Sequence, residues 1–349
     1  MLPQLIQSLD AGNPLATEEF RPIVAALTDE TVSAHDKAAF LAALATKGET
    51  PGEIAGFARE LGVLSVRPEL PEGLRGIDIL DVCGTGGDQL NTFNISTTVA
   101  ILCAAAGVVV AKHGNRAITS QSGSADVLEA LGIRIDLSPQ EAVDRLAEHG
   151  FAFFFAPKFH PAFRHIAPAR KLCAERGQRT IFNFLGPLLN PVRPNVQLIG
   201  VSRAELCEPI AQVLQELGVR RAMVVSGSVP DAGQTRSLDE LSILGPNRIA
   251  EFYHGRALHL SDETFAMLPL QAASLADLRG GDRAINAGII RQILGGEERG
   301  PKRDAVLLNA AAALFVAGKS RSIMEGWELA AEVIDSGRAA AKLKQLRGG

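Results

Sequence analysis

The residues best suited to chemistry lie between Asp81 and Leu131, in three polar loops rich in glycine, serine, threonine and asparagine. The first loop, Gly84-Thr85-Gly86-Gly87-Asp88, follows an apolar strand-like run, and its three glycines allow a sharp turn and a close approach to a ligand. The next segment, Asn94-Ile95-Ser96-Thr97, begins a helix-like run and offers side-chain oxygens that could cap the helix or bind an anion or Mg²⁺. Helix N-termini carry unpaired N–H donors that attract phosphate oxygens. The pattern therefore predicts a polyphosphate site.

The glycine-rich loop by itself matches neither common nucleotide-binding motif. It lacks the third glycine of the dinucleotide fingerprint, the acid about 20 residues further on, and the Lys-Ser/Thr pair of a Walker loop. Taken alone, it is equally compatible with a tight strand-to-helix turn. Two further segments favour a phosphate site: Lys112-His113-Gly114-Asn115-Arg116 after a second strand, and Ser122-Gly123-Ser124 at the start of a helix. In an open α/β sheet such loops converge at the carboxyl ends of the strands, although a surface turn is the alternative for each.

Charged side chains further along the chain could complete such a site. Asp239 and Glu240 stand between serines and could share a Mg²⁺ ion with a diphosphate, whereas such a pair taken alone is usually a solvated face. A basic helix could hold an anionic substrate through a bidentate arginine, although an exposed charged helix is the simpler interpretation for most of its residues. That helix contains His160, Arg164, His165, Arg170, Lys171, Arg176 and Arg179.

The elements that position these groups fall into two kinds. Residues 1–70 show helical spacing with no strand pattern, and Thr50-Pro51-Gly52-Glu53 is a capping box with proline at the first helical position. Pro22 lies inside a periodic stretch, so we expect a kink or a break there. After residue 71 short apolar runs alternate with helices, which predicts a mostly parallel sheet covered on both faces. The predicted strands are 77–82, 108–111, 151–156, 196–201 and 222–225, and 304–318 and 322–348 are predicted to be two closing helices.

Composition excludes several classes of protein. The 349 residues include 46% hydrophobic ones, enough for a sizeable core, and the net charge of −4 gives no general attraction to nucleic acid or anionic membranes. The four cysteines form no Cys-x-x-Cys pair, which favours reduced buried thiols. The longest apolar run, residues 99–111, is shorter than the roughly 20 residues of a membrane span. We expect a soluble cytoplasmic protein.

Together these segments resemble the anthranilate phosphoribosyltransferases of tryptophan biosynthesis, nearly from end to end. The resemblance extends to Phe159-His160-Pro161-Ala162-Phe163, to the run Arg179 to Pro191, and to the run Arg303 to Asn309. It implies a helical domain, residues 1–70 joined by 160–185, beside an α/β domain formed by residues 71–159 and 186–349. It also implies a homodimer built through the helical domain and Mg²⁺-dependent use of phosphoribosyl pyrophosphate.

The resemblance further implies roles for individual residues. Those that would hold phosphoribosyl pyrophosphate are Gly84, Gly87, Asp88, Thr92, Asn94, Ser96, Thr97, Lys112 and Ser124. Those that would engage Mg²⁺ are Ser96, Asp239 and Glu240. Those that would line the path and seat of anthranilate are Gly84, His113, Asn115, His160, Arg170, Gly186 and Pro187. Because the amine displaces pyrophosphate through an oxocarbenium-like state, no protein nucleophile is required. Lys112, Asn115 and Arg170 would position the transition state, and His113 is a candidate proton acceptor.

Three features depart from the family pattern. Gln89 stands where the family usually has glycine, the segment between Arg170 and Gly186 is a few residues longer than usual, and Ser228 to Arg236 resembles an insertion. The longer segment leaves Arg176 and Arg179 as competitors of Arg170 for the acceptor carboxylate. Two alternatives stay open: a related transferase or nucleoside phosphorylase with another aromatic acceptor, and a noncatalytic relative that binds nucleic acid through the basic helix.

Overall fold

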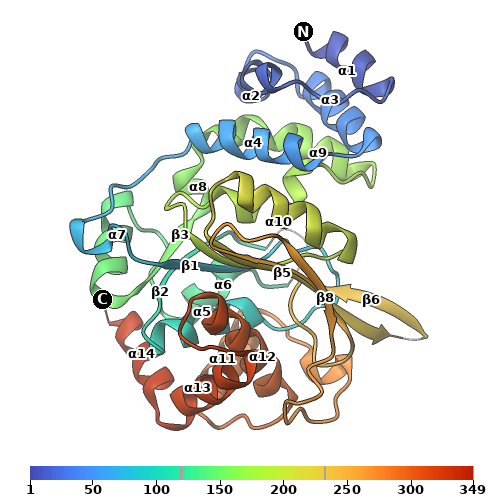
Figure 1. The fold of residues 1–349 in the computed structure, drawn as a ribbon. Helices are drawn as coiled ribbons and strands as arrows, with labels where there is room; N and C mark the ends of the chain where they lie inside the picture. The colour runs from blue at the N-terminus through green and yellow to red at the C-terminus, as the bar shows by residue number, and fades with distance from the viewer. Residues whose placement is uncertain (118–120, 232, 349) are drawn as a thin grey trace.

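The computed structural model describes residues 1–117, 121–231 and 233–348 (Figure 1). The chain begins with four helices, α1 (Leu2–Asp10), α2 (Phe20–Thr28), α3 (Ala34–Lys47) and α4 (Pro51–Val63). The predicted capping box is confirmed, since the Thr50 side chain accepts a hydrogen bond from the Glu53 N–H and the Glu53 carboxylate accepts one from the Thr50 N–H. The break expected at Pro22 comes earlier, because a 3₁₀ turn over Thr17–Glu19 precedes α2 and leaves Pro22 in the first turn, where proline is tolerated.

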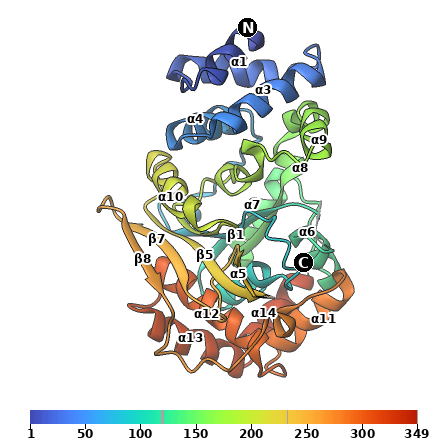
Figure 2. The ribbon, with the colours of Figure 1, turned by 90° about the vertical axis from the view of Figure 1, so that its right-hand side faces the viewer.

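The four helices do not stand alone. Helix α9 (Ala167–Glu175) packs on α3, and α10 (Cys207–Glu216) packs on both α4 and strand β5, so one apolar core runs from the first helices to the sheet. Figure 2 shows the resulting layers, with α1, α3 and α4 at one end, α10 next to the sheet, and α11 to α13 on the opposite side of the sheet. The division into domains at residues 70, 160 and 185 stays a prediction.

The central sheet is mostly parallel, as predicted. Its strands are β1 (Ile79–Gly84), β2 (Val109–Gly114), β3 (Phe151–Phe155), β4 (Val196–Gly200), β5 (Arg221–Asp231), β6 (Gln234–Leu238), β7 (Asn247–Tyr253) and β8 (His259–Glu263). The first five pair in parallel in the order β3-β2-β1-β4-β5, and β7 and β8 extend the sheet antiparallel. Strand β6 pairs only with β5 and makes a hairpin beside the sheet. The edge strand β8 is largely exposed and carries Asp262 and Glu263.

Helices cover both faces of the sheet because successive residues of its parallel strands are apolar and point to opposite faces. One face packs on α5 (Ile95–Ala105), α6 (Ser124–Leu131) and the closing helices α11 (Arg283–Leu294), α12 (Pro301–Val316), α13 (Ile323–Asp335) and α14 (Arg338–Arg347). The other face packs on α10 and, towards β3, on α7 (Pro139–His149). A short helix, α8 (Ala156–Phe159), follows β3.

Two expectations need correction. The stretch 322–348 is two helices, because Gly337 adopts a left-handed conformation with φ of +80° and ends the first of them. The basic stretch 160–179 is not one helix, since it consists of a 3₁₀ turn over Pro161–His165, helix α9 and a loop. None of the described helices is long and apolar enough to cross a membrane.

Candidate active site

The glycine loop leaves the carboxyl end of β1 and packs against the segment that follows β6. Its Thr85 N–H donates to the Gly200 carbonyl at 2.9 Å, and its Gly86 N–H donates to Asp239 Oδ2 at 2.6 Å. A Cβ atom on Gly84 would lie 2.2 Å from Asp239 Oδ2, and one on Gly200 would lie 1.7 Å from the Asp239 carbonyl oxygen. A side chain at either position would collide with Asp239. Glycine at these two strand ends therefore allows Asp239 to lie against the glycine loop.

The polar residues at the start of α5 connect distant segments. Asn94 is the N-cap residue, but its side chain does not cap the helix; the side-chain amide donates to the Ser122 carbonyl at 3.1 Å, and Oδ1 accepts from Asn286 at 2.9 Å. The Ser96 N–H donates to Glu240 Oε1 at 3.1 Å, and Thr97 is buried beside it. Thr92 lies just before, in an isolated bridge with Arg279. The start of α5 therefore faces both the third loop and the acidic pair.

Three carboxylates meet at this place. Asp88 Oδ2 is buried and has no hydrogen-bond partner in the described structure. Burial, reinforced by the charges of Asp88 and Glu240, raises the pKa of Asp239 well above its usual range, and burial raises the pKa of Glu240 to about 7. Buried carboxylates that repel one another in this way are suited to a cation. Within the described residues no group of three or more His, Cys, Asp or Glu side chains has the geometry to hold a metal ion by itself.

Lys112, near the carboxyl end of β2, supplies positive charge to this region. Its side chain is 1% exposed and its ammonium donates to the Val82 carbonyl at 2.6 Å, and its charge acts on both Asp81 and Glu240. Asp81 is fully buried and accepts hydrogen bonds from the His113 N–H at 3.4 Å and the Asn190 side chain at 2.9 Å. Burial raises the pKa of Asp81 to about 6. The Lys112 side chain is thus bound to the backbone of β1 and does not extend into solvent.

Two neutral histidines lie next to the lysine. The rings of His113 and His160 are 5.1 Å apart in an edge-on arrangement, and His113 Nδ1 is 3.3 Å from the Gly186 carbonyl oxygen. Burial lowers the pKa of His113 to about 3 and that of His160 to about 4. His113 Nε2 is buried and finds no partner among the residues described. Both rings are therefore uncharged near neutral pH, with a free nitrogen at His113.

The three candidate arginines occupy different places. The Arg170 guanidinium lies over the Phe182 ring at 5.4 Å, burial lowers its pKa, and it has no ion pair in the part of the chain that is described. Arg176 is exposed near the end of α9. Arg179 donates to the Gly87 carbonyl at 3.1 Å, which places it at the glycine loop. Of the three, Arg170 is therefore the partly buried arginine beside an aromatic ring, with no ion pair among the described residues.

The remaining predicted residues line the same loops. The Asn115 carbonyl accepts from the Ser124 hydroxyl at 3.3 Å, which joins the second loop to the third. Pro187 is buried, and its carbonyl accepts from Gln197 at 3.1 Å. Arg116 pairs with Asp126 and Glu129, so it stabilises the loop rather than awaiting a ligand.

Sequence reasoning missed two polar residues at this site. Asp81 was not predicted as a site residue, because a single acidic residue within an apolar strand matches no functional sequence motif. Arg236 donates to the Asp88 carbonyl at 2.9 Å, a contact with the backbone that no side-chain pattern could indicate.

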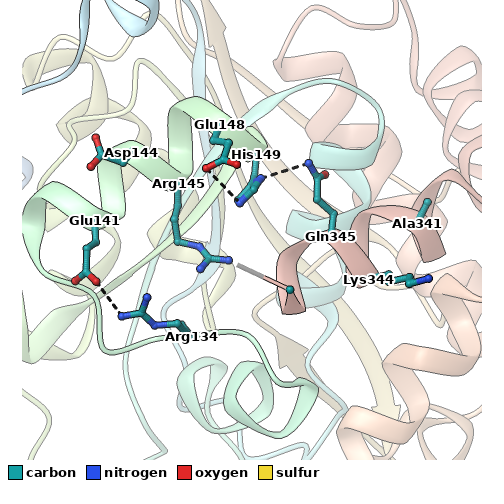
Figure 3. A pocket seen from close by; sticks show the side chains of 10 residues that line it. Arg134, Glu141, Asp144, Arg145, Glu148, His149, Ala341, Lys344 and Gln345 are labelled. Carbon is teal, nitrogen blue, oxygen red and sulfur yellow. Dashed lines mark hydrogen bonds and ion pairs between the residues drawn. The ribbon is translucent and has the colours of Figure 1, made fainter.

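A separate cavity lies away from these loops. It measures about 670 Å³ and is formed between α7 and α14 (Figure 3). Figure 3 shows the Arg134 and Glu141 pair on one side and His149 between Glu148 and Gln345 on the other. Because α7 ends just before β3 begins, this cavity is at the amino ends of the strands, away from every predicted site residue.

Comparisons with known proteins agree with this geometry. A family described as "Glycosyl transferase family, a/b domain" matches residues 76–340, and its "helical bundle domain" matches residues 3–61. The anthranilate phosphoribosyltransferase of Rubrobacter xylanophilus is 44% identical over 348 residues, covering 99% of this chain and 96% of the relative. Anthranilate phosphoribosyltransferase 2 of Streptomyces coelicolor is 46% identical, covering 95% of this chain and 94% of the relative.

Solved structures give the same result. The anthranilate phosphoribosyltransferase of Thermus thermophilus superposes with a TM-score of 0.86 at 42% identity, over 98% of each chain. The enzyme of Saccharomyces cerevisiae in complex with PRPP and Mg gives a TM-score of 0.84 at 28% identity, over 99% of this chain and 96% of the yeast chain. With such identity over nearly its whole length, the chain belongs to the anthranilate phosphoribosyltransferase family of glycosyltransferases.

Proposed function

We propose that the protein transfers the phosphoribosyl group of phosphoribosyl pyrophosphate to the amine of anthranilate, in tryptophan biosynthesis. The observation that carries this proposal is the convergence of two chemically distinct regions. One has glycine-loop N–H groups, Lys112 and three carboxylates, which suit a diphosphate with Mg²⁺. The other has neutral histidines and Arg170 over an aromatic ring, which suit an aromatic acid.

The donor would lie across the carboxyl ends of β1 and β2. Its phosphates would be bound by Gly84, Gly87, Asp88, Thr92, Asn94, Ser96, Thr97, Lys112 and Ser124. Mg²⁺ would be held by Ser96, Asp239 and Glu240, and the unpartnered Asp88 Oδ2 supports a cation at this place. When bound, the ion would neutralise charge that develops on the leaving pyrophosphate.

The acceptor would lie on the side of the loops that faces the helices. Arg170 would bind its carboxylate, since its guanidinium is partly buried and has no ion pair in the described structure. The walls would be formed by Gly84, His113, Asn115, His160, Gly186 and Pro187. Because His113 and His160 are neutral, they add no charge that would compete with Arg170 for the carboxylate.

The reaction then needs orientation more than protein nucleophiles. The anthranilate nitrogen forms a bond to the anomeric carbon while the bond from that carbon to the pyrophosphate oxygen breaks, and the amine loses one proton. Lys112, Asn115 and Arg170 would position the two substrates. His113 would accept the proton at its free Nε2, although its lowered pKa makes it a weak base.

The test follows the fluorescence of anthranilate when purified protein is mixed with phosphoribosyl pyrophosphate and Mg²⁺. We expect a fluorescence decrease that requires protein, donor and metal, checked by omitting each in turn. If the donor binds but anthranilate fluorescence persists, the acceptor is a different aromatic compound. If the donor does not bind, the phosphate assignment of the three loops is refuted.

We also propose a cytoplasmic homodimer assembled through the helical domain, residues 1–70 with 160–185. The apolar side chains of Val63 and Leu64, 63% and 40% exposed at the end of α4, support an association surface in this region. Light scattering coupled to gel filtration would measure the mass. A value near that of one 36.9 kDa chain at micromolar concentration would refute the dimer.

A further inference from the structure

The β5–β6 hairpin makes a contact that no local pattern in the chain predicts. Strand β6 pairs antiparallel with the end of β5, and Figure 1 shows the pair extending away from the rest of the sheet. Arg236, opposite Val229 in this hairpin, forms an ion pair with Asp231 at 3.2 Å. The same guanidinium donates to the Asp88 carbonyl at 2.9 Å. The segment Ser228 to Arg236, of which residue 232 lies outside the described structure, therefore contacts the glycine loop.

A second arginine contacts the loop at the neighbouring residue. Arg179, which follows α9 in the segment that is longer than usual, donates to the Gly87 carbonyl at 3.1 Å. Both guanidinium groups line one cavity of about 450 Å³ together with Gly87, Asp88 and Gln89. Two consecutive carbonyl groups of the loop are thus held by side chains from two distant parts of the chain.

Holding these carbonyls fixes the direction of the next N–H groups. In a planar trans peptide the C=O and N–H bonds point to opposite sides, and the structure contains no cis peptide among the described residues. The N–H groups of Asp88 and Gln89 therefore point away from Arg179 and Arg236. Neither N–H has a hydrogen-bond acceptor within the described residues, which leaves both available to an anionic oxygen.

Gln89 shows why the loop needs such support. It has a φ of +59°, the left-handed region that glycine adopts freely and a side chain with a Cβ atom adopts at a cost. The turn at position 89 is therefore made by a residue for which this backbone conformation is unfavourable. Arg236 bonds to the peptide unit between Asp88 and Gln89, the unit whose orientation this φ sets.

We propose that Arg236 and Arg179 are positioning residues that hold the glycine loop with its Asp88 and Gln89 N–H groups directed at the donor diphosphate. In this chain the β5–β6 hairpin thus supports donor binding by stabilising a turn that Gln89 makes at positive φ. The inference rests on the proposed function, because it assumes that the loop binds phosphoribosyl pyrophosphate.

The test compares Arg236→Ala with Arg248→Ala. Arg248 is a matched control, since it lies on β7, which like β6 pairs with β5, forms an ion pair with Asp262 at 2.9 Å, and has a side chain 36% exposed against 34% for Arg236. Calorimetric titration with phosphoribosyl pyrophosphate and Mg²⁺ gives the donor Kd, and steady-state rates give kcat. We expect Arg236→Ala to raise the donor Kd about tenfold, the usual cost of a charged hydrogen bond, with kcat changed less than about twofold. Arg248→Ala should leave both unchanged.

A second substitution separates positioning from the simple loss of positive charge. In a Gln89→Gly background the turn no longer needs support, so Arg236→Ala should raise the Kd only about two- to threefold. An undiminished tenfold effect in that background would show that Arg236 acts through charge alone and would overturn the inference. An unchanged Kd for Arg236→Ala would overturn it as well, whereas failure of the unmodified protein to bind the donor would refute the proposed function instead. If Arg236→Ala does not fold, Arg236→Lys, which keeps the charge but loses the second donor, should raise the Kd about threefold.

Discussion

Replacing Gly84 by alanine should disable the reaction while leaving the fold intact. The added Cβ would lie 2.2 Å from Asp239 Oδ2 and 2.9 Å from the Asp239 carbonyl oxygen. A carbon and an oxygen in van der Waals contact are about 3.5 Å apart, so the carboxylate must move by about 1 Å. Displacements of this size at a catalytic group cost about 100-fold in rate. The backbone at Gly84 does not have positive φ, so the substitution adds no conformational strain of its own.

The assay is the steady-state rate of anthranilate consumption as a function of Mg²⁺ concentration, with a thermal melt of each variant. We expect kcat/KM to fall about 100-fold and the Mg²⁺ requirement to rise, because Asp239 is displaced. Gly288→Ala, where a Cβ meets nothing within 4 Å, is the control and should behave like the unmodified protein. If Gly84→Ala folds and keeps its rate and Mg²⁺ dependence within about threefold, the placement of Asp239 in the metal site is refuted.

Three further substitutions test other parts of the site. Asp81→Asn should lower the free energy of unfolding by about 3 kcal/mol in urea melts, because buried Lys112 loses its counter-charge, whereas Asp78→Asn at the surface should cost under about 1 kcal/mol. Burial lowers the pKa of His160 to about 4, so the unfolded chain binds more protons below about pH 6.5, and the stability present above that pH is lost as pH falls towards 4. The loss is about 2 kcal/mol at pH 5, and His160→Asn should reduce it in urea melts at about pH 7.5 and 5. Glu240→Gln should raise the Mg²⁺ concentration for half-maximal rate at least about tenfold, and an unchanged value would contradict its role as ligand.

The sequence allowed the glycine loop, the start of α5 and the Lys112 segment to be placed together. That prediction was possible because parallel strands deliver their following loops to one edge, whatever the details of packing. The junction of Ser96 with Glu240, 3.1 Å apart although 144 residues separate them, was accessible only through resemblance to a family. No local pattern encodes a contact of that range.

Other features depended on packing that no single segment contains. The protonation states of Asp81 and His113 follow from burial, which the whole fold produces. Arg179 was considered as a substrate ligand, but it contacts a backbone carbonyl. Strands β7 and β8 and helix α11 were not predicted, since their short or mixed patterns resemble loops. Gly337 ended a helix that looked continuous by periodicity alone.

The exposed edge strand β8 has a consequence for behaviour at high concentration. An unpaired strand offers a row of backbone donors and acceptors to any other exposed strand, which is a common beginning of aggregation. Here Asp262 and Glu263 place two negative charges on that short edge, and Arg248 forms an ion pair with Asp262. If the β8 edge of a second copy approached this one, its own Asp262 and Glu263 would come close to these two acidic side chains and repel them. Charge repulsion therefore opposes the addition of a further strand from another copy at β8, which protects this edge from aggregation.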